Sequence, residues 1–395
     1  MKKFFTLLIL SFFVSSIFAQ FNYKQGSIKQ KKYLQIVPYQ KVKGLPVIPV
    51  IINGNTYNFI FDTGASGLII SDKLFKELNL PIIGSIDVGS SSGEYKKMRL
   101  TSLPALYIQE LTFINTQGLV FHEDFELFEC LGIDGFIGSS MLKKSVVQFD
   151  EQSKHIIITD NIKNLSLKKS FAKKIELSSK HAPLISVVLQ KGAKRVRHKV
   201  MFDSGQSDFF DLSINVFNWL NGRMDIVDKI AESEGVTSFG IHGIPAKQNH
   251  LSLNVPELII NEISFKDVVT TTTNGSNSRI GSKLFEYGTV TLDYNKKRFY
   301  FNSFDNISKN DLSRRPWSIL SSPQNDKLVV GIIWNKALES EINLGDEIVS
   351  INGINIQSMD ECELLRLDIP ESEVRIYELR DINTGEVKIV EINRI

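Results

Sequence analysis

The sequence is poor in cysteine: its 395 residues include only Cys130 and Cys362. Small exported proteins without a large core hold their loops with several disulfides, so two cysteines exclude a disulfide framework. A chain of this length can instead bury two or three substantial hydrophobic cores. We therefore expect both cysteines to be ordinary buried thiols.

The sequence also lacks the usual signature of a metal site. Its six histidines never take the His-Glu-x-x-His spacing that holds zinc in metalloproteases. His242 and His250 lie in or near the Gly-rich segment at residues 235–243, but solvated loop histidines are the commoner case. We expect no metal and no cofactor.

Long apolar runs are absent except at the N-terminus. Lys2 and Lys3 precede an apolar stretch over residues 4–18 that is too short to cross a bilayer, and Ala19 offers a small residue for cleavage. This pattern predicts a signal peptide over residues 1–19 and an exported protein, periplasmic or secreted. We expect no integral membrane segment after signal removal, and a monomer.

Charge of one sign is not in excess. Without residues 1–19, which carry two of the 46 basic residues and no acidic one, the chain has 44 basic and 44 acidic residues. Nucleic-acid-binding proteins present a basic surface, so this balance argues against nucleic acid as the main partner.

What the sequence does contain is an internal repeat. Asp62-Thr63-Gly64 returns 141 positions later as Asp203-Ser204-Gly205. Each triplet follows two apolar segments joined by a glycine turn, over residues 46–61 and 183–202, which predict strand, turn and strand. One such triplet would indicate only a turn, but two in matching surroundings indicate a duplicated lobe.

The repeat extends beyond the triplets. Ile137-Gly138-Ser139 corresponds to Ile280-Gly281-Ser282, 143 positions later. Helices are expected after each triplet, over residues 71–80 and from 213 to about 234, because each begins with a serine suited to an N-cap and carries apolar residues at helical spacing. Polar stretches at 161–174 and 303–315 separate the lobes from each other and from a third unit.

Paired carboxylates suit the activation of water. If the two loops meet, Asp62 and Asp203 lie side by side, and two like charges that close cannot both ionise. The pair then holds one base and one acid, which can activate a water and protonate a peptide carbonyl. Gly64 and Gly205 would let the backbone pack close to the carboxylates, because glycine has no Cβ.

Thr63 and Ser204 place a hydroxyl on each loop. Each hydroxyl can bond the backbone of the opposite loop and fix the geometry of the aspartate pair. With Gly64 and Gly205, these residues are expected to support the catalytic Asp62 and Asp203.

These motifs resemble the retropepsin and pepsin clan of aspartic proteases over roughly residues 32–304. The resemblance implies a mainly β fold in which two duplicated retropepsin-like β-barrel lobes, residues 32–162 and 172–304, form a pseudo-dimer. It also implies an aspartic endopeptidase that takes a peptide or protein substrate. Phe136-Ile137-Gly138 and Arg279-Ile280-Gly281 look like the family's apolar-apolar-Gly turns, although Arg279 replaces an apolar residue, and Gln206 departs from the family's loop pattern.

In the same family a mobile hairpin flap follows each aspartate loop. The corresponding Gly-rich segments lie at residues 89–95 and 235–243. The resemblance therefore implies that flap and substrate-binding residues are Ser91, Gly93, Tyr95, Gly240 and His242.

The C-terminal residues 312–395 form a third predicted unit. Within it, Leu344-Gly345-Asp346 and Asn352-Gly353 bound alternating apolar residues, which predict a strand between two turns. The stretch resembles the PDZ modules attached to bacterial proteases. That resemblance implies a small α+β domain that takes a C-terminal or strand-like peptide.

Three other functions compete with this one. Two Asp-x-Gly loops also occur in sugar-kinase and actin-like ATPases, but a Gly-rich adenosine loop is lacking here. Gly89-Ser-Ser-Ser-Gly93 fits the Gly-x-Ser-x-Gly pattern of serine hydrolases, but no strand-to-helix elbow or histidine partner accompanies it. The principal alternative is a non-catalytic peptide-binding protein that keeps the two loops as fold elements.

Overall fold

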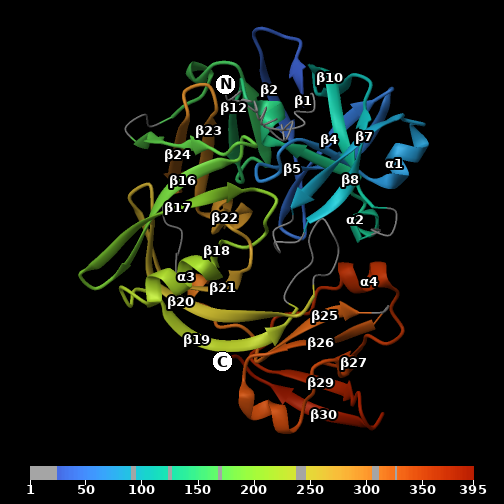
Figure 1. Cartoon of the computed structure of the whole chain (residues 1–395), viewed down its shortest axis with the longest axis vertical. Helices are drawn as coiled ribbons and strands as arrows, with labels where there is room; N and C mark the ends of the chain where they lie inside the picture. Colours follow the sequence, from blue (N-terminus) through green and yellow to red (C-terminus); the bar gives the residue numbers. More distant parts are fainter. Residues whose placement is uncertain are drawn as a thin grey trace, which may run out of the picture.

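The computed structural model describes residues 25–89, 95–122, 127–167, 171–236, 246–304, 311–324 and 327–395. The predicted signal peptide, residues 1–19, lies outside these ranges. The described chain is mainly β, with two strand-rich lobes and a smaller C-terminal unit (Figure 1). No helix of the described residues is long and apolar enough to cross a membrane.

The first lobe is a curved sheet that closes on itself. Its strand order is β3-β4-β5-β11-β6-β10-β8-β7, and β9 closes the barrel by pairing with both β10 and β4, while β1 pairs with β10. These strands are β1 (Gln25–Ile28), β3 (Gln40–Val42), β4 (Leu45–Ile52), β5 (Asn55–Asp62), β6 (Leu68–Ile70), β7 (Ile82–Gly89), β8 (Tyr95–Ser102), β9 (Leu106–Ile108), β10 (Leu111–Val120) and β11 (Gly135–Gly138).

The second lobe repeats this order as β15-β16-β17-β22-β18-β21-β20-β19, and β16 closes the barrel by also pairing with β20. Its strands are β15 (Glu176–Leu177), β16 (Pro183–Lys191), β17 (Lys194–Asp203), β18 (Phe210–Ser213), β19 (Asp228–Gly235), β20 (Gln248–Ile260), β21 (Ile263–Thr273) and β22 (Arg279–Gly281). The predicted fold of two duplicated β-barrel lobes is therefore confirmed.

A six-stranded sheet joins the lobes in the order β14-β24-β23-β12-β13-β2, with three strands on each side of its centre. At that centre Gln148 pairs with Thr291, and the Gln148 amide donates to the Thr291 hydroxyl at 2.9 Å. The strands are β2 (Leu34–Pro38), β12 (Val146–Asp150), β13 (His155–Thr159), β14 (Lys173–Lys174), β23 (Gly288–Asp293) and β24 (Arg298–Ser303).

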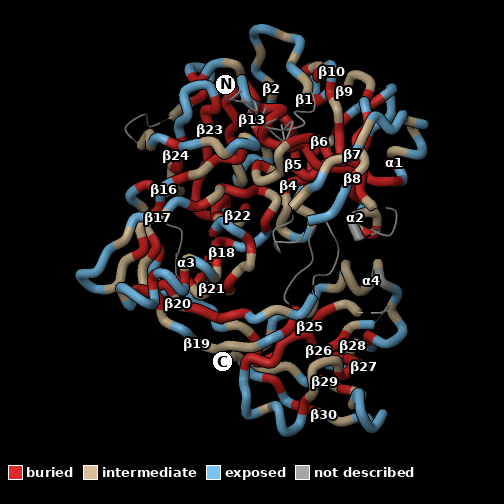
Figure 2. Tube along the Cα trace, in the orientation of Figure 1, coloured by how far each residue is buried: buried red, intermediate tan, exposed pale blue. Residues whose placement is uncertain are grey.

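One hydrophobic core runs through both lobes and the joining sheet (Figure 2). Phe149 of β12 stacks on Phe285, with ring centroids 4.5 Å apart, and meets Phe61 and Phe202 edge-on. Phe61 and Phe202 immediately precede the two aspartates, so apolar packing fixes the strand ends that carry them.

The helices after the aspartate loops are shorter than the sequence predicts. α1 (Asp72–Glu77) begins as expected, because the Ser71 hydroxyl accepts from the Leu74 N–H at 3.1 Å. α3 (Ile214–Asn221) ends well before residue 234, and β19 takes up residues 228–235. Ser213 does not cap α3, since its hydroxyl donates to the Gly275 carbonyl. The long-helix prediction was wrong because β20 provides a partner for that segment.

Short helical segments complete the two lobes. They are α2 (Leu127–Cys130), η1 (Ser139–Leu142), η2 (Ile162–Asn164) and η4 (Ser282–Tyr287). η1 and η4 follow the two Ile-Gly turns, which is another repeat of the same element in both lobes.

The C-terminal unit has a sheet in the order β25-β26-β27-β29-β30, with β28 beside β27, and a core of its own around Trp317, Ile348 and Leu379. The predicted strand is β27, which ends in a turn at Asn352 and Gly353, both with positive φ. The elements are η5 (Asp311–Ser313), β25 (Ile319–Gln324), β26 (Lys327–Ile333), η6 (Lys336–Ser340), β27 (Glu347–Ile351), β28 (Ile354–Asn355), α4 (Glu361–Arg366), β29 (Arg375–Arg380) and β30 (Val387–Ile392).

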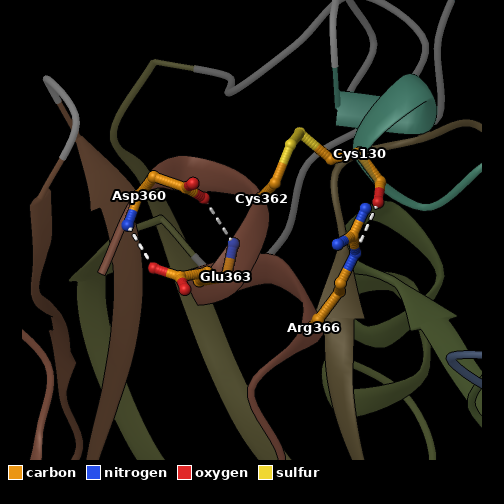
Figure 3. The surroundings of a disulfide bond; sticks show 5 residues. All are labelled: Cys130, Asp360, Cys362, Glu363 and Arg366. Carbon is orange, nitrogen blue, oxygen red and sulfur yellow. Dashed lines mark hydrogen bonds between the residues drawn. A yellow bond between two sulfur atoms is a disulfide. The ribbon is translucent and has the colours of Figure 1, made fainter.

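The sequence predicted that the two cysteines would be free thiols, but they form a disulfide. Cys130 of α2 and Cys362 of α4 are bonded, which joins the first lobe to the C-terminal unit across 232 positions (Figure 3). Next to the bond, the Arg366 guanidinium Nε donates to the Cys130 carbonyl at 2.7 Å. The prediction was wrong because the spacing of two distant cysteines does not show that the fold brings them together.

The C-terminal unit also contacts the second lobe. At the end of β19, the Val236 N–H donates to the Gly331 carbonyl of β26 at 3.2 Å. A Cβ on Gly235 would overlap that same carbonyl, so the two backbones approach as closely as glycine permits. The C-terminal unit therefore holds both lobes, one covalently and one by backbone contact.

Reduction of the disulfide is expected to lower the free energy of unfolding by about 2–5 kcal/mol, because the bond removes conformational freedom from a long loop of the unfolded chain. Thermal unfolding with and without reductant measures this. The Cys130→Ser/Cys362→Ser double variant is the control, and its unfolding temperature is expected to be lower and insensitive to reductant. An unfolding temperature that reductant leaves unchanged in the wild type would contradict this prediction.

Candidate active site

The two aspartates stand at equivalent strand ends. Asp62 ends β5 and Asp203 ends β17. In each lobe the Ile-Gly strand runs parallel beside the aspartate strand, so that Gly138 pairs with Asp62 and Gly281 with Asp203. The sequence-predicted Ile-Gly turns therefore lie directly beside the two loops.

Four reciprocal hydrogen bonds lock the loops together. The Thr63 N–H donates to the Ser204 hydroxyl at 3.0 Å, and the Ser204 N–H donates to the Thr63 hydroxyl at 3.0 Å. Each hydroxyl in turn donates to the strand of the other lobe, Thr63 to the Phe202 carbonyl at 2.8 Å and Ser204 to the Phe61 carbonyl at 2.5 Å. Both side chains are fully buried, which keeps water from competing for these bonds.

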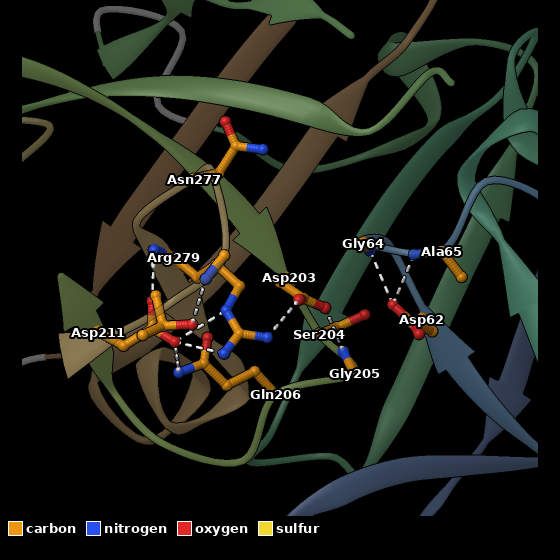
Figure 4. A network of polar contacts seen from close by, with 12 residues as sticks. Asp62, Gly64, Ala65, Asp203, Ser204, Gly205, Gln206, Asp211, Asn277 and Arg279 are labelled. Atoms are coloured by element: carbon orange, nitrogen blue, oxygen red, sulfur yellow. Dashed lines mark hydrogen bonds and ion pairs between the residues drawn. The ribbon is translucent and has the colours of Figure 1, made fainter. Parts of the chain in front are cut away.

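Each carboxyl group is held by its own loop. Asp62 Oδ1 accepts from the N–H groups of Gly64 and Ala65 at 2.8 and 2.9 Å, and Asp203 Oδ1 accepts from the Gly205 N–H at 3.0 Å (Figure 4). These bonds fix the orientation of both carboxyl groups.

The two glycines interlock with the opposite aspartates. A Cβ on Gly64 would overlap the Asp203 carboxyl group, and one on Gly205 would overlap the Asp62 carboxyl group. Neither position has the positive φ that usually selects glycine. The reason for glycine here is the close approach of each loop to the other lobe's carboxylate.

The carboxyl groups are close enough to share a proton. Burial raises the pKa of Asp62 well above its usual range, and the negative charge of Asp203 and a hydrogen bond to it raise the pKa further. The N–H groups of Ala65 and Gly64 oppose this rise. The pair therefore retains one proton at a pH where two isolated aspartates would both be ionised.

The serines after the Ile-Gly turns support the aspartate loops, a role that the sequence did not predict. The Ser139 N–H donates to the Ala65 carbonyl and the Ser282 N–H donates to the Gln206 carbonyl, at 2.9 and 2.8 Å. Their hydroxyls bond the same loops, Ser139 to the Thr63 carbonyl and Ser282 to that of Gln206. The repeat of Ile-Gly-Ser in both lobes is the sequence feature from which this role could have been predicted.

Beside Asp203 the second lobe departs from the first. Arg279 places its guanidinium Nη1 3.5 Å from Asp203 Oδ2 and also forms an ion pair with Asp211. The Gln206 amide donates to Asp211 Oδ2 at 3.1 Å (Figure 4). The two departures from the family pattern therefore belong to one polar network that ends at Asp203.

The predicted flap residues are described only in part. Tyr95 begins β8 on the β7–β8 hairpin; its ring packs against Gly89, and the residue is 74% exposed. Ser91, Gly93, Gly240 and His242 lie outside the described residues. In the described ranges, no cluster of three His, Cys, Asp or Glu side chains is arranged to hold a metal ion.

Residues 48–141 match a family model described as aspartyl protease. This match, within the first lobe, makes that lobe similar to the aspartyl protease family. No curated protein matches the chain significantly.

Solved structures similar to the chain include aspartic proteinase from Irpex lacteus, with a TM-score of 0.42 and 11% identity, covering 70% of this chain and 100% of that one. They also include Basic 7S globulin from soybean, with a TM-score of 0.40 and 11% identity, covering 71% and 99%.

Proposed function

We propose that the protein is an exported aspartic endopeptidase that hydrolyses peptide bonds with a water activated between Asp62 and Asp203. The observation that carries this proposal is the interlock of the two loops, in which Gly64 packs on Asp203 and Gly205 on Asp62. This packing brings two carboxyl groups from opposite lobes together, where burial and the charge of Asp203 raise the pKa of Asp62.

In the first step, the ionised carboxylate takes a proton from water as the water oxygen attacks the peptide carbonyl carbon. The protonated carboxyl group gives its proton to the carbonyl oxygen, so a neutral tetrahedral diol forms. The proton count of the pair is unchanged, because one proton enters and one leaves.

In the second step, the diol collapses. One diol hydroxyl returns its proton to a carboxylate, the carboxyl group protonates the amine nitrogen, and the C–N bond breaks. The Thr63 and Ser204 bonds keep the two carboxyl groups in place throughout, which lowers the reorganisation that the reaction needs.

We assign substrate contact to the two hairpins after the loops. β7–β8 would contribute Ser91, Gly93 and Tyr95, and β19–β20 would contribute Gly240 and His242. Hairpins at matching places in both lobes can hold an extended peptide by strand addition.

The C-terminal unit is proposed to recruit a peptide in the manner of a PDZ domain. A pocket of about 220 Å³ is lined by residues of β26, β27 and α4, among them Leu328, Ile348 and Leu364. A strand and a helix around such a pocket, which Lys327, Glu347 and Gln357 also line, suit a C-terminal or strand-like peptide. By the PDZ resemblance, residues 315–319 correspond to the segment that would bind the peptide's carboxylate, but the Ser318 N–H in it already donates to the Asn393 carbonyl.

Export is supported by the disulfide between Cys130 and Cys362. Structural disulfides form and persist mainly in oxidising compartments, such as the periplasm or the cell exterior. The bond therefore agrees with the N-terminal pattern that predicts a signal peptide.

The alternative function is non-catalytic peptide binding. The observation behind it is that Gln206 and Arg279, which depart from the family's pattern, belong to the polar network beside Asp203.

A digest of a peptide library by the wild-type protein between pH 3 and 8 separates the two functions. For an endopeptidase we expect internal cleavage that a chelator leaves intact. A peptide carrying a hydroxyl-bearing carbon in place of the scissile carbonyl is expected to stop it, because it mimics the tetrahedral diol. Peptide binding without cleavage at every pH would support the alternative.

A further inference from the structure

Arg279 and Asp211 occupy places that the first lobe fills with apolar residues. Arg279 pairs with Asp211 across β22 and β18, as Phe136 pairs with Ile69 across β11 and β6. Phe136 and Ile69 lie in an apolar cluster, 3% and 5% exposed. The fold therefore does not need an ion pair at this place.

A buried ion pair at this place costs free energy, because both charges lose their hydration. The Arg279 and Asp211 side chains are only 19% and 10% exposed, so both lose most of their hydration. Replacing such a pair by apolar residues of similar size is often neutral or stabilising. Because the ion pair is present in the second lobe and not at the equivalent place in the first, we infer that it acts on the aspartates.

Asp211 fixes the position of the guanidinium. It accepts from the Arg279 backbone N–H at 2.9 Å and from Nε at 2.8 Å, and it forms a further bond with Nη2. These contacts leave Nη1 directed at Asp203, 3.5 Å from Oδ2. Although burial opposes its charged form, Asp211 and Asp203 raise the pKa of Arg279, so its charge persists at every working pH.

The two aspartates consequently have different partners. Asp62 accepts two neutral backbone N–H groups, whereas Asp203 accepts one and faces a full positive charge. A neighbouring cation favours the ionised carboxylate more strongly than a neutral donor does.

We propose that Arg279, anchored by Asp211, places the negative charge of the pair on Asp203 and the proton on Asp62. Arg279 is thus a positioning residue that acts through Asp203. This rests on the proposed function and deepens it, because Asp203 becomes the base that takes the proton of water and Asp62 becomes the acid. The raised pKa of Asp62 agrees with this assignment.

Other ionisable groups surround this network. Asp208, whose side chain is exposed, interacts electrostatically with Arg279 and Lys283, and Tyr294 interacts with Asp62. Burial raises the pKa of Asp211 to about 6, against the opposing charge of Arg279. These groups are common to the wild type and the variants below, apart from the positions substituted.

The test follows the carboxyl carbons of the protein by NMR after labelling aspartate with ¹³C at Cγ. Asp62→Asn and Asp203→Asn assign the two signals. In the wild type we expect the Asp203 signal to be that of a carboxylate from mild acid upward and the Asp62 signal to stay protonated to higher pH. The kcat/KM profile against pH is measured on the same samples.

Arg279→Met removes the charge and keeps an unbranched side chain about as long as the apolar stem of arginine. Without the cation, ionisation at Asp203 should need a pH higher by about one unit, so the acid limb of the kcat/KM profile moves up by the same amount. Arg279→Lys keeps a charge and should keep most of the wild-type position. An acid limb and an Asp203 signal that stay in place in folded Arg279→Met would overturn the proposal.

Arg279→Met leaves Asp211 without its cation and can impair folding. The double variant Arg279→Phe/Asp211→Ile avoids this, because it installs the apolar pair of the first lobe. We expect it to fold and to show the same upward shift of about one pH unit. A folded double variant with wild-type titration would mean that the ion pair only supports the fold, and would also overturn the proposal.

The NMR measurement needs no substrate, so the two proposals fail separately. If the wild type cleaves nothing but Asp203 carries the charge, the charge assignment stands and the protease function falls. If the wild type cleaves peptides while Asp203 carries the proton, the assignment falls and the protease function stands.

Discussion

Asp62→Asn and Asp203→Asn are each expected to lower kcat/KM by on the order of a thousandfold, because an amide has nearly the shape of a carboxylate but cannot exchange a proton with water. Both residues receive backbone N–H bonds at Oδ1, and an amide oxygen can accept these in place of the carboxylate. The loss should therefore fall on the reaction and leave the fold intact. Peptide cleavage rates and thermal unfolding measure the two effects separately.

Asp267→Asn is the matched control. Asp267 is exposed in the second lobe and has a positive φ, which asparagine also adopts readily. Its kcat/KM should equal that of the wild type. If either Asp62→Asn or Asp203→Asn kept more than about a tenth of kcat/KM, which corresponds to only ~1.4 kcal/mol of transition-state stabilisation, a water shared by two carboxylates would be the wrong mechanism.

Gly64→Ala and Gly205→Ala are expected to lower kcat/KM by about a hundredfold or more, because each new methyl group would displace the carboxyl group of the opposite lobe. A shift of about 1 Å in a reacting group costs roughly that factor. The two variants should behave alike, since the packing is reciprocal. Peptide cleavage at several pH values measures the effect.

Gly222→Ala serves as the control for this pair. Gly222 ends α3 with an ordinary negative φ, and a Cβ there would meet only the Asn218 carbonyl at 3.4 Å. We expect no loss of activity. Wild-type rates in folded Gly64→Ala would show that the carboxyl groups do not depend on this packing.

The sequence predicted those parts of the fold that are repeated. The two Asp-Thr/Ser-Gly triplets, their preceding strands and the Ile-Gly turns all recur at nearly constant spacing, and the structure has the same strand order in both lobes. The expected hydroxyl contacts of Thr63 and Ser204 with the opposite backbone are confirmed as well. The aspartates' catalytic role stays a prediction.

Features that depend on contacts between distant segments were missed. The disulfide and the contact of Gly235 with Gly331 need the packing of one unit on another, and the end of α3 needs the pairing of β19 with β20. Arg279 was a partial signal of the ion-pair network, because a charged side chain in an otherwise apolar turn needs an oppositely charged partner. The sequence did not name Asp211, since an aspartate 68 positions away is one of many acidic residues.

The Cys130–Cys362 bond determines whether cleavage of the backbone separates the two lobes. Asp62 precedes the bonded segment and Asp203 lies within it, so the disulfide encloses the whole second lobe in a covalent ring. A single break of the backbone between residues 130 and 362 opens this ring without releasing a fragment. Both aspartates then remain on one molecule, and the nick becomes visible as two pieces only after reduction.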